Sequence, residues 1–292
     1  MNRTHATLND MEYTYITQEL KERLRIFYDG GRTLTVLTGA GLSADSGIPT
    51  FRDVDGFWTV GSKNYTPEEM GTYRMYRAKP LEVWKWYLYR KGICLRAEPN
   101  RGHQAIRKPE ELFCDRFRLI SQNVDGLHLA AGNSLERTYF IHGTLERCRC
   151  GEECSEELFP FPDFILEKGE ELTVDQIKKL KCPKCNAFTR PHVLWFDEYY
   201  DEKYYRRDSA LHAAARTGLL LIVGTSGATT LPQLVVQHTV AGNGMVVDIN
   251  KKANHFSTLV EESANGFVLR GSSSEILPEF VACFSEFADT AT

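Results

Sequence analysis

The sequence from Thr33 to Asp53, TLTVLTGAGLSADSGIPTFRD, is the feature that most constrains the fold of this chain. Its first part is an apolar, β-branched run that ends in glycine, which predicts a buried strand. The residues from Gly39 to Ala44 fit the pattern G-x-G-x-x-G/A, in which glycines allow a tight turn and let backbone N–H groups approach a pyrophosphate. Alone, this pattern is weak evidence for a nucleotide site, because many strand-to-helix turns are rich in glycine for packing.

The rest of the chain repeats the order of strand, polar loop and helix. Apolar runs that end in small or polar residues recur in FRLISQNVDGLH, LLLIVGTSG and MVVDIN, and helical patterns such as RGHQAIRKPEELF, DEKYYRRDSALHAAARTG and LPQLVVQHTVAG lie between them. This alternation predicts an α/β protein with a Rossmann-like open parallel sheet and helices on both faces. Ligands of such sheets bind beyond the carboxyl ends of the strands, so these loops are expected to line one crevice.

The segment after the glycine loop argues against an ordinary dehydrogenase. Such an enzyme places an acidic residue at the end of a second strand about 20 residues further on. The corresponding window here reads TFRDVDGFW, which is not a strand pattern. We interpret the proline- and aromatic-containing segment SGIPTFRDVDGFW as a mobile lid that folds over the nicotinamide end of a bound dinucleotide.

The cysteines point to a smaller module inserted between strands. Five of the 8 cysteines lie between Cys148 and Cys185, and this bunching favours a metal site over a disulfide framework. The motif CPKC, from Cys182 to Cys185, has zinc-knuckle spacing, and the second pair of ligands must come from Cys148, Cys150 and Cys154. Four thiolates leave no open position for water, so the expected site is structural.

Composition limits the partners and the compartment. The formal net charge is −4 and the basic residues are scattered, so we expect no direct nucleic-acid ligand. No run approaches the roughly 18 apolar residues that a membrane span needs, so no membrane partner is expected. The first residues lack a signal-peptide pattern and carry acids, which predicts a reducing, cytoplasmic location with the nucleus as the alternative.

Taken in order, the motifs GAGLSADSGIPTFR, QNVDGLH, IHG, the paired cysteines, RPHVLWF and GTS resemble sirtuins, the NAD-dependent protein-lysine deacylases. The resemblance spans roughly Leu34 to Ile249. It implies NAD as co-substrate, one structural zinc per chain and the acylated lysine of a protein or peptide as substrate. The implied large, Rossmann-like NAD-binding domain comprises residues 1–50, 99–144 and 190–292, and the small domain comprises a helical lid and acyl-pocket module at 51–98 and a zinc-ribbon module at 145–189.

The resemblance also assigns roles to single residues. His142 aligns with the general base of the family and Asn123 with its amide at the ribose and nicotinamide end, so both are expected to be catalytic. His128 is the competing histidine, and its position suggests packing behind the loop. The residues expected to bind the cofactor are Gly39, Ala40, Gly41, Ser43, Asp45, Thr50, Phe51, Arg52, Gln122, Asn123, Asp125, His142, Gly224, Thr225, Ser226 and Asn250.

The reaction implied by the resemblance transfers the acyl group from lysine to ADP-ribose. The acyl-lysine oxygen displaces nicotinamide from the ribose, and an alkylimidate forms. His142 then takes a proton from the ribose hydroxyl that attacks the imidate, a task that suits a histidine that is neutral near pH 7. An ADP-ribosyltransferase or NAD hydrolase is the alternative on the same crevice. A nucleotide sensor without turnover is another, against which the intact base and pocket argue.

A tyrosine and an arginine mark the acyl pocket. Tyr87 and Arg90 are three residues apart on an expected helix, so they share one face. The family branch that acts on succinyl, malonyl and glutaryl lysine carries Y-x-x-R here, and a guanidinium beside a phenol suits a carboxylate. The alternative is an aromatic core stripe with Arg90 in solvent, and Tyr89 is the alternative phenol. We therefore predict removal of negatively charged acyl groups as well as, or instead of, acetyl.

The resemblance also implies which cysteines bind zinc and which residues bind the substrate peptide. The family places its first zinc ligand eight residues after the base histidine, which selects Cys150, and the chosen set is Cys150, Cys154, Cys182 and Cys185 with Cys148 as the spare. Val193, Phe196 and Glu198 are expected to bind the substrate, because peptides add as a strand beside this loop in the family. Asp197 stands where the family commonly has glycine, so we expect it to alter peptide fit or favour basic sequences.

Overall fold

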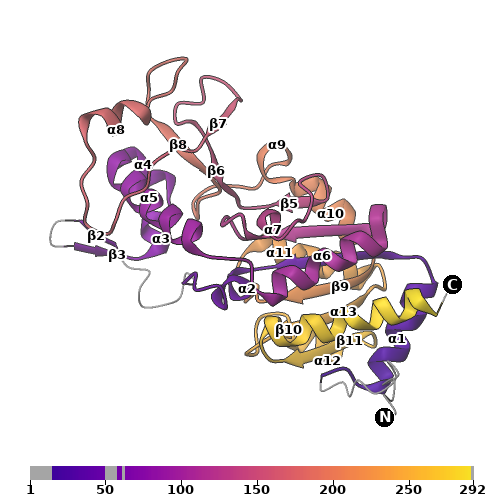
Figure 1. Cartoon of the computed structure of the whole chain (residues 1–292). Coiled ribbons are helices and arrows are strands. Elements are labelled where there is room, and N and C mark those ends of the chain that lie inside the picture. Colours follow the sequence, from indigo (N-terminus) through magenta and orange to yellow (C-terminus); the bar gives the residue numbers. More distant parts are fainter. Residues whose placement is uncertain (1–14, 50–57, 61–62, 291–292) are drawn as a thin grey trace, which may run out of the picture.

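The computed structural model describes residues 15–49, 58–60 and 63–290, and a six-stranded sheet lies at its centre (Figure 1). The strand order is β11-β10-β9-β1-β4-β5, and every neighbouring pair is parallel. In chain order this is 3-2-1-4-5-6, the order of a doubly wound dinucleotide-binding fold. The strands are β1 (Thr33–Thr38), β4 (Phe117–Ser121), β5 (Thr138–Phe140), β9 (Thr217–Val223), β10 (Met245–Asn250) and β11 (Gly266–Arg270). The sheet predicted from the sequence is confirmed.

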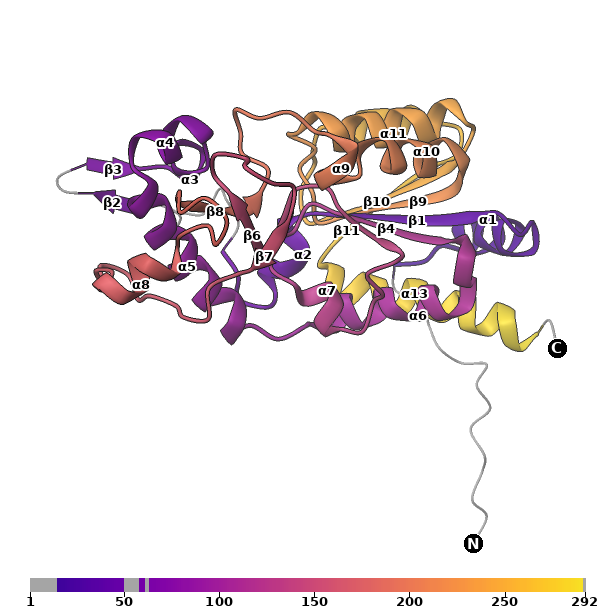
Figure 2. The ribbon, with the colours of Figure 1, turned by 90° about the horizontal axis from the view of Figure 1, so that it is seen from above.

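Helices cover both faces of this sheet (Figure 2). One layer contains α1 (Gln18–Asp29), α6 (Arg101–Phe113) and α13 (Ser273–Asp289), and the other contains α10 (Arg207–Arg216), α11 (Thr230–Ala241) and α12 (Ser257–Glu262). Along β9, Leu219 and Leu221 pack toward the first layer, whereas Leu220 and Ile222 pack toward the second. This alternation places apolar side chains on both faces, and it explains why the strand reads as a continuous apolar run.

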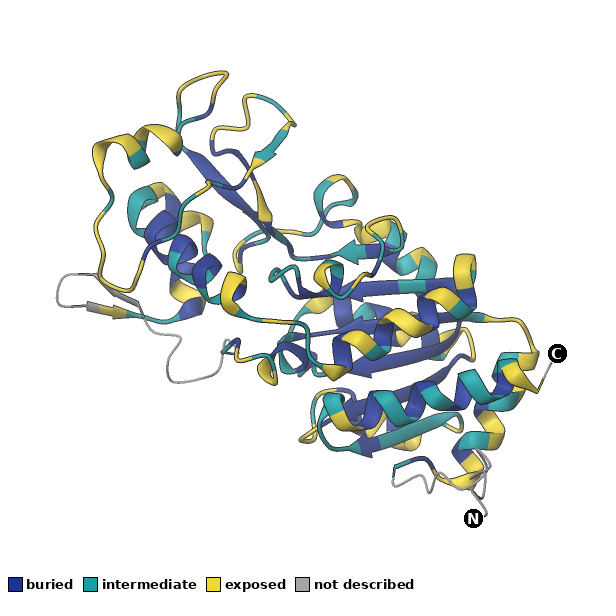
Figure 3. Cartoon of the chain, in the orientation of Figure 1, coloured by how far each residue is buried: buried dark blue, intermediate teal, exposed yellow. Residues whose placement is uncertain are grey.

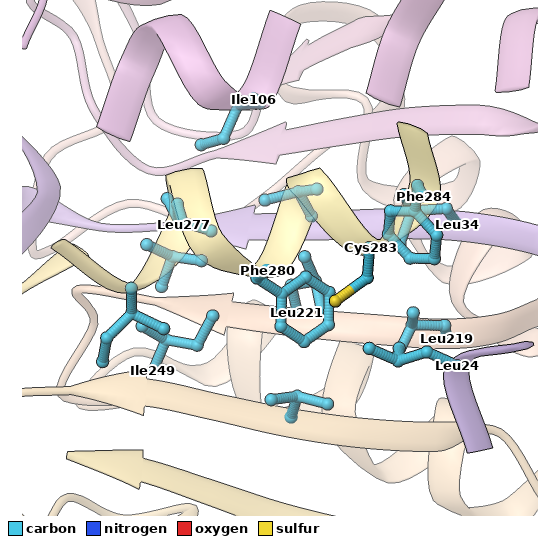
Figure 4. Packing of buried hydrophobic residues seen from close by; sticks show 14 of the residues in the cluster. Leu24, Leu34, Ile106, Leu219, Leu221, Ile249, Leu277, Phe280, Cys283 and Phe284 are labelled. Carbon is cyan, nitrogen blue, oxygen red and sulfur yellow. The ribbon is translucent and has the colours of Figure 1, made fainter. Parts of the chain in front are cut away.

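The larger of these two cores is built around α13 (Figure 4). Phe280 and Phe284 of this helix are fully buried against the sheet, together with Leu24 of α1 and Ile106 of α6. The strands of the sheet are buried along most of their length, while the outer faces of the helices are exposed (Figure 3). The site at the strand ends therefore rests on a rigid support.

A smaller unit lies beside the strand ends of the large sheet (Figure 1). It contains the antiparallel sheet β7-β6-β8, formed by β6 (Gly143–Cys150), β7 (Leu158–Pro160) and β8 (Thr189–Val193). Its helices are α3 (Pro67–Met70), α4 (Tyr73–Ala78), α5 (Pro80–Arg96) and α8 (Val174–Lys179), and a hairpin of β2 (Trp58–Val60) and β3 (Lys63–Tyr65) adjoins them. The stretch 66–97 thus forms three helices.

One local prediction needs correction. The sequence predicted one helix over residues 201–218, but Arg206 has φ +53° and separates α9 (Glu202–Tyr205) from α10. The break is stabilised because the Glu202 carboxylate accepts a hydrogen bond from the backbone N–H of Ser209, at 2.9 Å, in the first turn of α10. Strand β8 pairs with β6 in the small sheet and so crosses residue 190, where the expected large domain resumes.

The chain after the glycine loop departs from a regular helix as predicted. Helix α2 (Ala40–Ala44) has only 5 residues, and Gly47 follows with φ +82°. Among the described residues, no helix combines the length and the apolar character needed to cross a membrane.

Candidate active site

The loops after β1 and β9 touch each other at the point where the strand order reverses. The Gly39 N–H donates to the carbonyl of Val223 at 3.0 Å, and the Gly41 N–H donates to that of Gly224 at 2.7 Å. A Cβ on Gly41 would lie 2.7 Å from the Gly224 oxygen, and Gly224 itself has φ +60°. Glycine is therefore required here by the packing of the two loops, whatever ligand they bind.

One cavity of about 910 Å³ lies at these strand ends and extends to α5 and the loop after β8. Eleven of the residues expected to bind the cofactor line it: Ala40, Gly41, Ser43, Gln122, Asn123, Asp125, His142, Gly224, Thr225, Ser226 and Asn250. The structure thus brings the glycine loop, the QNVD loop, the GTS loop and the end of β10 around a single space. This is the crevice that a doubly wound sheet offers to a dinucleotide.

The other residues expected at the cofactor stand apart from this set. Within the described part of the chain, Gly39 and Asp45 do not line the cavity. The Asp45 carboxylate instead accepts bonds from Lys251 Nζ, at 2.9 Å, and from the Ser272 hydroxyl. Asp45 therefore ties the glycine loop to the rim of the sheet. Thr50, Phe51 and Arg52 lie outside the described residues.

Ser43 of the glycine loop holds the two polar side chains of the QNVD loop. Asn123 Nδ2 donates to Ser43 Oγ at 3.0 Å, and Ser43 Oγ donates to Asp125 Oδ2 at 2.7 Å. The Leu127 N–H donates to the other carboxylate oxygen at 2.9 Å, which is an Asx turn. Burial raises the pKa of Asp125, and these hydrogen bonds and the Arg90 charge oppose the rise. The turn holds the side chains of Asn123 and Asp125 at the cavity, so the same hydrogen bonds stabilise the loop and position these two residues.

His142 is oriented by a backbone carbonyl on one side and a phenol on the other. Its Nδ1 lies 3.0 Å from the Gln122 oxygen, and its Nε2 lies 2.8 Å from Tyr200 Oη. A carbonyl can only accept, so Nδ1 carries the proton and Nε2 is the basic nitrogen. Burial lowers the pKa of His142 to about 4, against the Gln122 hydrogen bond that raises it, so the ring is neutral near pH 7.

Tyr200 is the functional-site residue that the sequence reasoning missed. It lines the cavity and contacts the imidazole of His142 directly. The segment YYDEKYY contains tyrosines at 199, 200, 204 and 205, and nothing in their order distinguishes one from another. The one sequence feature that pointed to these tyrosines was their position directly after the expected peptide-binding loop.

His128 is a packing residue, as its sequence position suggested. It is 1% exposed, its Nε2 lies 2.9 Å from Thr38 Oγ1, and its ring packs against His103 with centroids 5.1 Å apart. Burial lowers the pKa of His128 to about 3, with His103 as a further cause. Among the described residues that line the cavity, His142 is the histidine.

The expected acyl-pocket residues open onto the same cavity. Tyr87 and Arg90 both line it, and the Trp195 indole N–H donates to Tyr87 Oη at 2.9 Å. The Arg90 guanidinium carbon lies 5.5 Å from the ring centroid of Trp86. Trp84, Trp86 and Tyr87 are buried in one apolar cluster, as the core-stripe alternative expects, but Arg90 lines the cavity.

The loop after β8 is anchored through its acidic side chains. Val193, Phe196 and Glu198 line the cavity, but the Glu198 carboxylate accepts from both terminal nitrogens of the buried Arg190, at 2.7 Å for Nη2, and from the Trp195 N–H at 3.0 Å. The Asp197 carboxylate accepts from the N–H groups of Tyr73 and Arg74, at 2.6 and 3.1 Å, at the start of α4. Asp197 thus acts as a helix cap between two modules.

Four cysteines gather at one end of the small sheet. The sulfur atoms of Cys150, Cys154, Cys182 and Cys185 lie within 4.8 Å of one another, with Cys150 to Cys185 at 3.5 Å and Cys154 to Cys182 at 3.6 Å. Tetrahedral zinc with Zn–S bonds of about 2.3 Å would hold sulfurs about 3.8 Å apart, so the set fits zinc. Cys148 instead donates to the carbonyl of Pro160. Within the described residues none of the four lines the cavity, so the metal would be structural.

Comparisons with known proteins agree with this geometry. A model of the Sir2 family matches residues 39–230. An NAD-dependent protein deacylase of Leptospira interrogans is 36% identical over 265 residues, which cover 90% of this chain and 97% of the relative. A Sir2 homologue–NAD complex superposes with a TM-score of 0.72 at 30% identity, covering 93% of this chain and 95% of that one. A mutant Sir2 homologue with 2'-O-acetyl ADP ribose gives 0.75 at 30% identity, over 91% and 96%.

Proposed function

The chain belongs to the Sir2 family, and from that premise we propose that it is an NAD-dependent protein-lysine deacylase that removes acyl groups ending in a carboxylate, as well as or instead of acetyl. The observation that carries the second half of this proposal is one cavity that holds His142 in one part and Tyr87 with Arg90 in another. Cofactor chemistry and acyl recognition then occur in a continuous space.

Support for NAD-dependent deacylation comes from the chain and its relatives together. The Leptospira relative is named an NAD-dependent protein deacylase, and a Sir2 homologue binds 2'-O-acetyl ADP ribose. When bound, NAD would supply the nicotinamide leaving group and the ribose hydroxyl that accepts the acyl group. In this chain, Gly41 and Gly224 would lie beside the pyrophosphate, and Asn123 and Asp125 beside the nicotinamide ribose.

His142 would act as the general base. Its Nε2 is unprotonated because Nδ1 is held by the Gln122 carbonyl, and burial keeps the ring neutral. A neutral imidazole can accept a proton from a hydroxyl and return it later, which contributes about 10²- to 10⁴-fold to a rate.

The carboxylate preference is supported by the bonding of Tyr87. Its oxygen accepts the Trp195 N–H, so its own proton is left to be donated toward a ligand oxygen. Burial lowers the pKa of Arg90, and an arginine guanidinium nevertheless stays charged at neutral pH. A phenol donor beside a guanidinium favours a carboxylate over the methyl group of acetyl.

The proposal is tested by measuring kcat/KM with succinyl-lysine and acetyl-lysine peptides at saturating NAD. Replacing Arg90 by Met removes the charged donor and keeps the length of the side chain. We expect desuccinylation to fall roughly 10- to 100-fold and deacetylation to change less than about threefold. Arg96→Met, at an exposed site at the end of the same helix, is the control. Equal losses of both activities in Arg90→Met would reject the carboxylate role.

An ADP-ribosyltransferase or NAD hydrolase remains the alternative activity. Both would need Asn123 and His142, but neither needs an acyl pocket with Tyr87 and Arg90. Nicotinamide release measured with and without acylated peptide separates them. Release that requires the peptide supports deacylation, whereas equal release without it supports the hydrolase.

A further inference from the structure

Tyr200 lies beside the general base, and both residues line the cavity. Its hydroxyl lies 2.8 Å from His142 Nε2, the nitrogen that is free to accept a proton, and its side chain lines the cavity. The two rings are tilted by 33° with centroids 5.8 Å apart, so the phenol meets the imidazole through its oxygen. The basic nitrogen is therefore already engaged by a hydroxyl of the protein itself.

The direction of each hydrogen bond around His142 is fixed. Because Nδ1 donates to the Gln122 carbonyl, Nε2 must accept, and Tyr200 must donate. Burial raises the pKa of Tyr200 to about 12, with a Thr229 hydrogen bond as an opposing cause, so the phenol keeps its proton at neutral pH. The oxygen of Tyr200 retains lone-pair capacity to accept a hydrogen bond from a substrate hydroxyl.

The backbone around Tyr200 is anchored on both sides. Two residues before it, Glu198 is bonded to the buried Arg190 and to the Trp195 N–H. The next residue, Asp201, caps α9 by accepting from the Tyr204 N–H at 2.6 Å. Moving the backbone of Tyr200 away from His142 would disturb these contacts. A substrate hydroxyl therefore reaches the base more readily through the phenol than by displacing it.

We propose that Tyr200 is a second acid–base residue of this site, which passes a proton from the attacking ribose hydroxyl to His142. In the step, the O–H bond of the substrate hydroxyl breaks as a new Oη–H bond forms on Tyr200. The original Oη–H bond breaks as an Nε2–H bond forms on His142. The electron pair of the broken substrate O–H bond forms the new bond from the ribose oxygen to the imidate carbon. The cationic imidate is thereby neutralised, the tyrosine ends neutral and the histidine ends as imidazolium, so protons and charge balance. This inference rests on the proposed deacylase function.

The first test measures the bond in the protein without NAD. The imidazole of His142 is titrated by NMR in the wild type and in Tyr200→Phe, with assignment from a His142→Asn variant. Donation to Nε2 stabilises the neutral ring, so its loss should raise the pKa of His142 by about one pH unit. The other titratable groups on the surrounding loops, Asp125 and Glu198, keep their partners Ser43 and Arg190 in this variant. An unchanged His142 titration would overturn the proposal.

The second test separates the base-dependent step from nicotinamide departure. Succinyl peptide and NAD are supplied with labelled nicotinamide, and label incorporation into NAD is compared with formation of free lysine. Incorporation needs no base and should stay within about twofold in Tyr200→Phe, while deacylation should fall about 100-fold. The matched control is Tyr199→Phe, whose side chain is 91% exposed, and it should behave like the wild type.

These experiments distinguish failure of the Tyr200 relay from failure of the proposed deacylase function. Unchanged or faster deacylation in Tyr200→Phe would show that the phenol is displaced rather than used, and equal loss of both readouts would show a merely structural role. Either result overturns the relay while leaving deacylation standing. If the wild type and Tyr199→Phe both form no free lysine, the proposed deacylase function fails, and the relay fails with it.

Discussion

The two ends of the cavity are built by different means. At the nucleotide end, contact between loops is made by backbone atoms, as where the Gly41 N–H meets the Gly224 carbonyl. At the substrate end, contact is made by side chains from distant segments, as where Trp195 bonds to Tyr87 across 108 positions of the chain. The first kind of contact restricts the residue type to glycine. The second accepts any side chain of suitable length and polarity.

This difference predicts how each end tolerates substitution. Tightly packed backbone atoms leave no room for another atom, so a single added Cβ forces the loops apart. Side-chain contacts can be lost singly, and the remaining anchors keep the loop in place. Mutations at the nucleotide end should therefore act on folding and on every ligand, whereas those at the substrate end should act on the peptide or acyl group alone.

The largest effect is expected from Gly41→Val. Its Cβ would lie 2.7 Å from the Gly224 oxygen, so the loops after β1 and β9 must separate. We expect a loss of about 2 to 4 kcal/mol in the free energy of unfolding and no measurable NAD binding. Urea unfolding and calorimetric titration with NAD measure the two quantities. Gly47→Ala is the control, because a Cβ there meets nothing within 4 Å and the cost is that of φ +82° alone, about 1 kcal/mol. Similar losses in both variants would contradict the loop-packing account.

An intermediate effect is expected from acid, because buried histidines lie behind the nucleotide loops. Burial lowers the pKa of His128 from its ordinary value of 6.5 to about 3. The unfolded chain therefore takes up the proton first as pH falls, and stability is lost between pH 6.5 and about 3. His128→Phe should make this slope shallower by about 1.4 kcal/mol per pH unit, measured by urea unfolding at several pH values. The exposed His212→Phe is the control, and equal slopes in the two variants would refute the prediction.

The smallest effect is expected from Asp197→Ala at the substrate end. This change removes the carboxylate that caps the start of α4, at a cost of about 1 kcal/mol in the free energy of unfolding. The KM for the peptide should change severalfold, while the KM for NAD should stay constant. Steady-state kinetics with each substrate varied in turn checks this. If the KM for NAD changed as much as the KM for the peptide, the proposed difference between the nucleotide end and the substrate end would be contradicted.

Most of the fold could be predicted from the sequence because its determinants are local. Continuous apolar runs such as TGLLLIV in β9 mark strands buried on both faces, and the spacing of Cys182 and Cys185 marks a metal knuckle. The break of the helix after Ala44 was visible in SGIP. The glycine loop was also visible, although its glycines are as necessary for loop packing as for a ligand.

The rest depended on contacts between distant segments. The bond between Tyr200 and His142 could not be predicted, because the four tyrosines of YYDEKYY are chemically equal and only the path of the loop after β8 decides which one reaches the base. The capping role of Asp197 could not be predicted for the same reason, since its carboxylate bonds to the start of α4. The division of residues 201–218 into two helices depended on Arg206, whose left-handed backbone no sequence pattern marks.

We propose that one cavity joins the dinucleotide crevice to a carboxylate-binding acyl pocket. The most direct measurement is a crystal structure of the protein with NAD and a succinyl-lysine peptide bound. We expect the nicotinamide ribose beside His142 and Tyr200, and the succinyl carboxylate on Arg90 and Tyr87. A succinyl group that points into solvent, or a dinucleotide whose ribose lies away from His142, would contradict the account.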